Sequence, residues 1–327
     1  MNSIRLIVAA LLSGAFLHSP VAASTDSEDW QPRQAIQLVV PFAPGGGTDI
    51  LARILAPELG KDLGRTVIVV NKPGASSIIG TETVVQSAAD GHTLLLADTA
   101  LMVNPSLQPN LPYDTARDLT PIVHIATSPV VLLVNPSVPA NNVRELIELE
   151  GKKPGSLSYA SGGYGSSTHL AGELFKLETG ASITHVPYKG TGLAFADVVG
   201  GHVPMIFAGI GTAGQFVKDG KLRALAITGE QRHPLMPDVP TFLESGFPNV
   251  NSRSDWGILA KAGTPEPAKK RLNASINTAL NDRDVGRRLA ELAFDLKGGS
   301  PEEFSQVIET ETKKWANVIN EAKIKLE

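Results

Sequence analysis

Two glycine-rich segments of this chain have the features of an anion-binding loop. The first, Val-Pro-Phe-Ala-Pro-Gly-Gly-Gly-Thr-Asp at 40–49, leads from a predicted strand into a predicted helix. Glycines let the backbone turn with its N–H groups pointing inward, and a helix N-terminus adds partial positive charge. The segment has neither the Lys-Ser/Thr ending of a P-loop nor the full glycine spacing of a dinucleotide fingerprint, which disfavours nucleotides. A tight turn with Thr48 or Asp49 as the N-cap explains the same residues.

A second segment of the same design follows at 158–169. It leaves a strand, passes through Ser-Gly-Gly-Tyr-Gly-Ser-Ser-Thr-His, and enters a helix at Leu170. If the two loops face one another from two lobes, each can hold part of a carboxylate with uncharged donors, at roughly 1.5 to 3 kcal/mol for each charge-assisted hydrogen bond. A third strand-to-helix segment, 186–192, adds Lys189, which is either a counter-charge or a solvated surface residue.

Three enzyme patterns are present only in part. Gly-Ala-Ser-Ser at 74–77 begins like a nucleophile elbow, but Ile78 stands where the closing glycine belongs. His169 and Glu173 lie one helical turn apart, yet no further metal ligands accompany them. Four aspartates have the chemistry of paired catalytic carboxylates, but no spacing brings two of them together: Asp49, Asp98, Asp197 and Asp255. We therefore expect no catalysis, no metal and no cofactor.

The first residues indicate export. A start containing Arg5, an apolar run over 6–17 and the small residues Val-Ala-Ala at 21–23 form the pattern of a secretory signal peptide, cleaved near Ala23. The chain has no cysteine for a lipid or a disulfide, and no later stretch is long enough to span a bilayer. We expect a soluble mature protein in a periplasm. A net charge of -4 gives no basic surface for nucleic acid.

The elements that must position these loops form an α/β pattern. Short β-rich runs alternate with helical patterns, as in mostly parallel sheets flanked by helices. About 300 mature residues exceed what one hydrophobic core organises, so two domains are expected. Pro57 is expected to kink or shorten the first helix, and the chain from Thr264 is mostly helical in pattern. The predicted strands are 37–41, 66–70, 93–97, 130–135, 157–160, 184–187, 204–208 and 222–228.

Several ordered motifs make the chain resemble the Bug/TctC family of solute-binding proteins that serve tripartite tricarboxylate transporters. The resemblance covers nearly the whole mature chain. Besides the segment that ends at Asp49, it rests on Asn-Lys-Pro-Gly-Ala at 71–75, Ala-Asp-Gly-His-Thr-Leu-Leu-Leu at 89–96, Leu-Pro-Tyr-Asp at 111–114, His-Leu-Ala-Gly-Glu-Leu-Phe at 169–175, His-Val-Pro-Tyr-Lys-Gly at 185–190 and Pro-Asp-Val-Pro-Thr at 237–241.

The resemblance implies a two-lobed clamshell of the type II periplasmic-binding fold. Residues 24–125 with 250–327 would form one lobe and 126–249 the other. The two glycine-rich loops would close on one carboxylate, partly through ordered water, so the site needs no arginine. The protein would bind a small mono- or dicarboxylate, possibly aromatic, as a monomer and deliver it to inner-membrane permease subunits. The predicted ligand-binding residues are Phe42, Pro44, Gly45, Gly46, Gly47, Thr48, Asp49, Ser76, Ser77, Ser161, Tyr164, Gly165, Ser166, Ser167, Thr168, His169, Lys189, Gly190, Ala208, Gly209 and Arg253.

Departures from the family pattern bear on specificity. Ser-Ser-Ile at 76–78 replaces a usual Gly-Gly-Asn, Tyr164 stands where a small or amide residue is usual, Thr168 often corresponds to Gly or Pro, and Arg253 to an uncharged residue. We hypothesise that Tyr164 stacks on the far end of the ligand or that Arg253 pairs a second carboxylate. Asp49 is either a partner for a ligand amine or a helix cap. Two other functions stay open: a sensory protein that signals to a membrane kinase, and an exported serine esterase.

Overall fold

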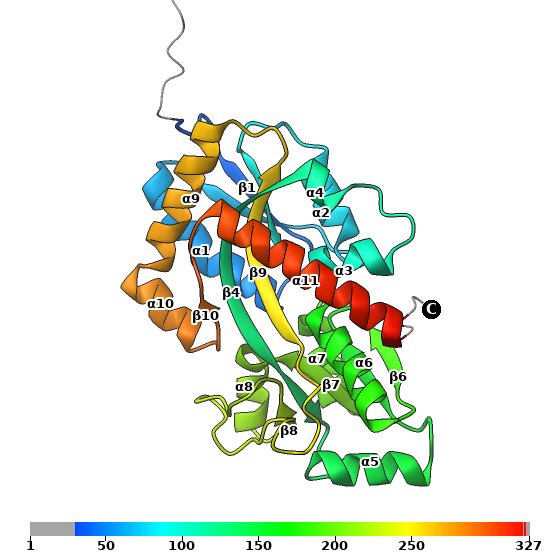
Figure 1. Ribbon diagram of the computed structural model, residues 1–327. Helices are drawn as coiled ribbons and strands as arrows, with labels where there is room; N and C mark the ends of the chain where they lie inside the picture. The colour runs from blue at the N-terminus through cyan, green and yellow to red at the C-terminus, as the bar shows by residue number, and fades with distance from the viewer. Residues whose placement is uncertain (1–29, 323, 325–327) are drawn as a thin grey trace, which may run out of the picture.

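The computed structural model describes residues 30–322 and 324 (Figure 1). The predicted signal peptide, 1–23, lies outside the described residues. No helix within the described ranges combines the length and apolar character needed to cross a bilayer. The elements in chain order are β1 Ile36–Val40, α1 Gly47–Leu63, β2 Val67–Asn71, α2 Ile78–Val85, β3 Thr93–Ala97, α3 Ala100–Leu107, α4 Thr115–Asp118, β4 Leu119–Val134, α5 Val143–Lys152, β5 Ser158–Ser161, α6 Ser167–Thr179, β6 Thr184–Pro187, α7 Thr191–Val199, β7 Met205–Gly209, α8 Ile210–Lys218, β8 Arg223–Ile227, β9 Arg253–Lys261, α9 Glu266–Leu280, α10 Arg283–Ala290, β10 Asp295–Leu296 and α11 Pro301–Ala322.

The strands pair in the order β2-β1-β3-β9-β4-β7-β5-β6, with β8 and β10 also paired to β4. Two parallel triplets lie at the ends of this order, β2-β1-β3 and β7-β5-β6. We call the halves of the molecule built on them the first and second lobe; they are the upper and lower parts of Figure 1. The triplets agree with the expected parallel sheets, but the strands that join them, β9 and β4, run antiparallel to their neighbours.

Strand β4 passes from one lobe into the other. Its first part, Leu119–Pro129, pairs with β9, and its last part, Val130–Val134, pairs with β7. The sequence predicted only 130–135 of this 16-residue strand and did not predict β9. Both strands are buried on both faces along most of their length, so they show no alternation of polar and apolar residues, and Pro121 and Pro129 further obscure the signal of β4.

Helix α1 continues through Pro57, contrary to the prediction that this residue would shorten it. The helix runs for 17 residues and ends at Gly64, whose φ of 66° is left-handed. A proline inside a helix costs about 3 kcal/mol. Burial of the opposite face outweighs that cost, since Leu51, Leu55 and Leu59 are at most 1% exposed.

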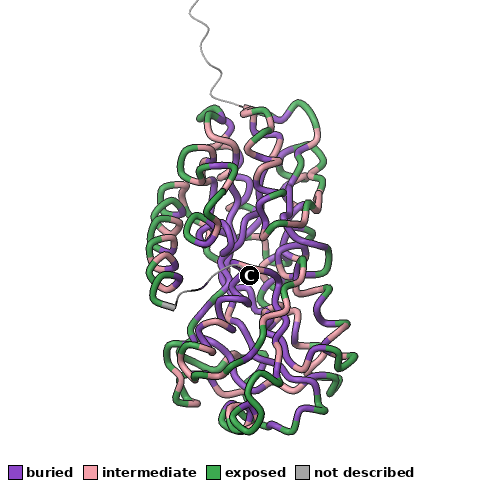
Figure 2. Tube along the Cα trace, turned by 90° about the vertical axis from the view of Figure 1, so that its right-hand side faces the viewer, coloured by how far each residue is buried: buried purple, intermediate pink, exposed green. Residues whose placement is uncertain are grey.

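Each lobe has its own apolar core. In the first lobe, β1 and β3 pack against α1, which in turn packs against α9, with Leu38, Leu55 and Leu272 fully buried. In the second lobe, β4 and β7 pack against α6, with Phe207 and Phe175 inside. Figure 2 shows buried segments of the chain running through the middle of the molecule, with exposed segments along its outer edges. The lobes are therefore packed bodies joined by the long strands and by α11.

Candidate functional site

A cavity lies where the first turns of four helices from the two lobes come together. The volume that the centre of a water-sized sphere can occupy in it is ≈ 60 Å³. The first N–H groups of a helix have no partner within it, and the aligned peptide dipoles make that end partly positive. The lining residues are Phe42, Gly46, Gly47, Thr48 and Ile50 around α1; Gly162, Ser166, Ser167 and Thr168 around α6; Gly190 and Thr191 at α7; Gly209, Gly211 and Thr212 at α8; and Asp98, Ser128, Ser254, Trp256, Leu292 and Phe294.

The first glycine-rich loop is held in shape by Asp49, which is buried. Its carboxylate accepts hydrogen bonds from the Gly45 N–H at 3.0 Å, from Arg53 at 3.0 Å and from Asn71 at 2.9 Å, and Asn71 also donates to the Phe42 carbonyl. Burial raises the pKa of Asp49, but the hydrogen bonds from Arg53, Gly45 and Asn71 outweigh it and hold the pKa below its ordinary value. Asp49 is therefore an ionised brace of the loop and does not line the cavity.

Thr48 connects this loop to the central strands. The Trp256 indole N–H donates to the Thr48 hydroxyl oxygen at 2.9 Å, and both residues are buried. A Cβ on Gly47 would lie 3.3 Å from the Trp256 ring, so glycine allows the helix to begin directly against the indole. The Thr48 hydroxyl keeps its own proton for an acceptor in the cavity.

The second glycine-rich loop is held by neutral groups. The Gly162 N–H donates to the Thr168 hydroxyl at 2.9 Å, and Ser166 caps α6 by accepting from the His169 N–H. The His169 Nδ1 accepts from the Gly165 N–H at 3.2 Å. Burial lowers the pKa of His169 to about 4, so at pH 7 the ring is neutral and Nδ1 carries the lone pair that this bond requires.

The two lobes touch around the cavity, as in a closed clamshell. The Ala43 N–H of the first lobe donates to the Lys189 carbonyl of the second at 2.8 Å. A Cβ on Gly192 would lie 2.8 Å from the Gly45 carbonyl carbon, a separation that only glycine allows. A small ligand bound between these loops is enclosed on both sides, and its exchange requires the lobes to separate.

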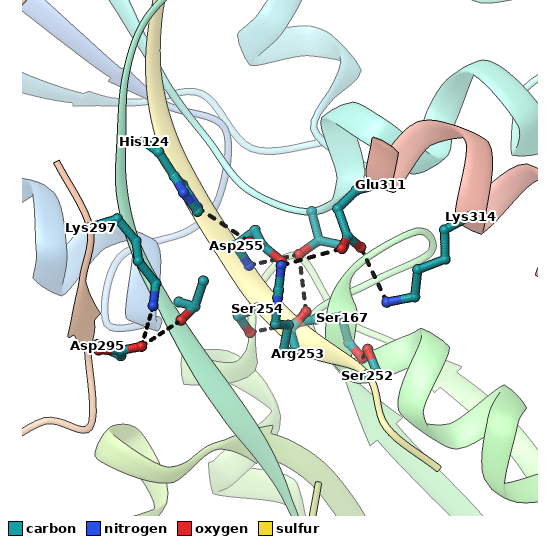
Figure 3. Close-up of polar contacts among 12 residues, drawn as sticks. His124, Ser167, Ser252, Arg253, Ser254, Asp255, Asp295, Lys297, Glu311 and Lys314 are labelled. Atoms are coloured by element: carbon teal, nitrogen blue, oxygen red, sulfur yellow. Dashed lines mark hydrogen bonds and ion pairs between the residues drawn. The ribbon is translucent and has the colours of Figure 1, made fainter. Parts of the chain in front are cut away.

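Strand β9 presents one face to the cavity and the opposite face to α11. Ser254 points to α6, where its hydroxyl lies 2.6 Å from that of Ser167, and Ser252 donates to the Ser167 carbonyl at 2.8 Å (Figure 3). Arg253 points the other way, 3.0 Å from Asp255 and 3.3 Å from Glu311 on α11. The structure thus places Ser254 at the cavity and Arg253 away from it.

The cavity contains nine of the predicted ligand-binding residues. They are Phe42, Gly46, Gly47, Thr48, Ser166, Ser167, Thr168, Gly190 and Gly209. The others lie outside its lining. Pro44, Gly45, Ser161, Gly165 and Ala208 are neighbours in the same loops and strand ends, and Asp49 and His169 brace those loops.

Four more predicted residues lie away from the cavity. Tyr164 packs edge-on against His185, at a ring separation of 4.9 Å. The Lys189 side chain is exposed. Ser76 and Ser77 lie against α3, where the Asn104 amide donates to the Ser76 carbonyl at 2.8 Å.

Some lining residues were not among the predicted ones. Thr191 and Thr212 have a readable signal, a hydroxyl residue in the first turn of a helix that begins after glycine. Ser128, Ser254 and Trp256 have none, because they reach the cavity from β4 and β9, which the sequence did not reveal in full. Asp98 was considered only as a catalytic carboxylate. No group of three or more metal-ligating side chains occurs among the residues that the structure describes.

Comparisons with known proteins agree on one family. The chain matches the model of the tripartite tricarboxylate transporter family receptor over residues 51–324. Protein BugT of Bordetella pertussis is 37% identical over 328 residues, which cover 100% of both chains. The solved structure of the periplasmic binding protein BugD has 32% identity and a TM-score of 0.87, over 90% of this chain and 100% of that one.

Two further solved structures contain carboxylates. A protein of R. palustris with adipate has 33% identity and a TM-score of 0.87, over 91% of this chain and 99% of that one. MatC from Rhodopseudomonas palustris with bound malate has 32% identity and a TM-score of 0.85, over 88% of this chain and 99% of that one. The fold is that of the two-lobed periplasmic binding proteins, as the sequence predicted.

Proposed function

This chain belongs to the tripartite tricarboxylate transporter receptor family, and we propose that it captures a small carboxylate between its lobes and delivers it to the permease subunits of such a transporter. The convergence of the α1, α6, α7 and α8 N-termini on one cavity carries the proposal. Each supplies N–H groups that have no partner within the helix, and together they favour an anion.

Uncharged donors suit a receptor that must release its ligand. Among the described residues that line the cavity, none is a lysine or arginine. The hydroxyls of Thr48, Ser167 and Thr191 and the backbone N–H groups can each hold a carboxylate oxygen directly or through water. Charge-assisted bonds of this kind contribute roughly 1.5 to 3 kcal/mol each, so a few of them give useful affinity without a buried salt bridge. The relatives with adipate and malate support this ligand class.

Delivery requires that the lobes close when the ligand is bound, so that the closed state distinguishes the loaded protein from the empty one. We propose that the lobes comprise residues 24–125 with 250–327 and residues 126–249, and that they rotate about the crossing strands β4 and β9. Contacts made only in the closed state, such as Ala43 to Lys189, would favour that state once the ligand joins the two loops. The mature chain, with residues 1–23 removed, would work in the periplasm as a monomer and catalyse no reaction.

A thermal-shift screen of the chain without residues 1–23 tests the ligand class. The panel pairs aliphatic and aromatic carboxylates with their uncharged amides. A ligand that binds only the folded state stabilises it by RT ln(1 + [L]/Kd), or about 2.7 kcal/mol at a hundredfold excess over Kd. We expect a higher Tm with at least one carboxylate and no change with its amide. Equal shifts with acid and amide, or none with any carboxylate, would contradict the proposal.

A further inference from the structure

One acidic side chain, that of Asp98, lines the cavity among the donors. Asp98 follows β3 directly and precedes α3, and it is 9% exposed. No other charged side chain occurs among the described residues of the lining. In a site built to hold a carboxylate, an ionised Asp98 would repel the ligand, so its presence needs a physical reason.

A hydrogen bond from the start of α3 satisfies only part of this carboxyl group. Asp98 Oδ1 accepts from the Ala100 N–H at 2.9 Å, and within the described ranges no lysine, arginine or histidine pairs with it. The two other buried aspartates differ because they have ion-pair partners: Asp49 pairs with Arg53, and Asp255 pairs with Arg253 and His124. Burial raises the pKa of Asp98 to about 7. An ionised carboxylate enclosed without a counter-charge is unstable relative to one in water.

The charged groups on neighbouring strands do not supply that counter-charge. Thr99 links Asp98 to β9, because its hydroxyl accepts from the Asp255 N–H at 3.0 Å. Asp255, Arg253 and His124 lie on β9 and β4, where they pair with one another (Figure 3), and none of the three lines the cavity. The cavity therefore has donors for an anion and, at Asp98, one acceptor for a cation.

We propose that the ligand carries an ammonium group as well as a carboxylate, and that Asp98 binds this ammonium group. The inference rests on the proposed function, in which the helix N-termini hold the ligand's carboxylate. Asp98 then determines specificity: it favours an amino-acid-like zwitterion and disfavours the same carbon skeleton without the amine. An ammonium has three donors, and its bond to an ionised oxygen is of the strong, charge-assisted kind.

Titration calorimetry with matched ligand pairs tests the assignment. The probes are aspartate with succinate and glutamate with glutarate, on the chain without residues 1–23, at pH 8, where Asp98 is ionised. We expect the amino member of at least one pair to bind at least about tenfold tighter, which corresponds to one charge-assisted hydrogen bond. Tighter binding of the amine-free member in both pairs would overturn the proposal and leave the carboxylate receptor standing. Absence of binding by every carboxylate would instead refute the proposed function.

The variant Asp98→Asn separates the charge of the side chain from its hydrogen bond to Ala100. Asparagine keeps an oxygen acceptor for the Ala100 N–H, so the hydrogen bond at the start of α3 is retained. We expect the variant to lose at least about tenfold in affinity for the amino member and to bind the amine-free member as well as or better than the wild type. Asp238→Asn, at an exposed position, is the matched control and should change neither. Equal losses for both members would assign Asp98 a structural role only.

The pH dependence distinguishes the proposal from its main alternative. If ionised Asp98 binds an ammonium, affinity falls as the pH is lowered from 8 to 6 and the carboxylate takes up a proton. If instead a protonated Asp98 donates to the carboxylate of an amine-free ligand, affinity falls as the pH is raised over the same range. The second result, lost in Asp98→Asn, would overturn the ammonium assignment.

Discussion

The two glycine-rich loops are alike in sequence but are held in place by different chemistry. The first loop, 42–49, is braced by an ionised carboxylate that bridges a backbone N–H, an arginine and an amide. The second loop, 161–168, is braced by hydroxyls and a neutral histidine. Similar loops can therefore present similar N–H groups to one ligand while depending on different protonation states. The predictions below concern ligand affinity, from the largest expected effect to the smallest.

Asp49→Ala should have the largest effect. It leaves the Gly45 N–H and the Asn71 amide without their acceptor, at a cost in the free energy of unfolding of about 2 to 3 kcal/mol. The first loop then loses the shape that aims its N–H groups, so carboxylate affinity should fall at least about a hundredfold. Urea unfolding and calorimetry measure the two effects. Asp284→Ala, on the exposed face of α10, is the control, and unchanged affinity in Asp49→Ala would show that the loop keeps its shape alone.

His169→Ala should weaken binding about tenfold, because the Gly165 N–H loses its acceptor and the second loop relaxes. It should also change the response to acid. The pKa of His169 is about 4 in the folded chain against an ordinary value of 6.5, so the unfolded chain takes up the proton first. Wild-type stability therefore falls as the pH is lowered from 6.5 to 4.

Melting temperatures between pH 7 and 4 measure this difference. The melting temperature should depend less steeply on pH in His169→Ala than in the wild type. His185, whose pKa burial lowers to about 2, and Asp98 contribute to the pH dependence of both proteins. His169→Asn is the matched variant, since its side-chain oxygen can accept from Gly165 without titrating in this range. Asp49 acts differently: because its pKa is lowered in the folded chain, its contribution to stability is lost only when the pH falls below 3.8. If acid weakened the first loop before the second, the assignment of the two braces would be wrong.

Ser167→Ala should reduce affinity about fivefold. The Ser167 and Ser254 hydroxyls lie 2.6 Å apart across the boundary between α6 and β9, and a neutral hydrogen bond contributes about 1 kcal/mol net. Calorimetry with the ligand found in the screen measures the change. Ser305→Ala, at an exposed position of α11, should leave affinity unchanged. A loss as large as that of Asp49→Ala would mean that the Ser167 hydroxyl holds the ligand directly and not through water.

Sequence patterns predicted the parts of the site that are local along the chain. A strand end, a glycine turn and a helix start lie within ten residues at both loops, so the residues alone indicate where N–H groups are free to bind an anion. The alternation of strands and helices likewise predicted the α/β class. Lobe boundaries stay a prediction, since β4 itself passes between the lobes.

The rest of the site depends on pairing between distant segments. Ser128 and Ser254 are opposite one another in register on β4 and β9, a contact that no local pattern encodes. The orientation of Arg253 follows from the same strand: alternate residues share a face, so Arg253 and Asp255 point one way and Ser254 the other. Without β9, the sequence could not show that Arg253 faces away from the cavity.

Lys189→Ala should have the smallest effect, although a lysine beside an anion site invites the opposite expectation. The contact that Lys189 makes between the lobes comes from its backbone carbonyl, which accepts from the Ala43 N–H, and alanine keeps that group. The side chain is exposed, where a charge interacts weakly through water and salt. Calorimetry at low and at physiological salt should give affinities within about twofold of the wild type. A larger loss of affinity at low salt alone would mean that Lys189 attracts the ligand over a distance. A larger loss at both salt concentrations would mean that its ammonium group contacts the ligand when the lobes close.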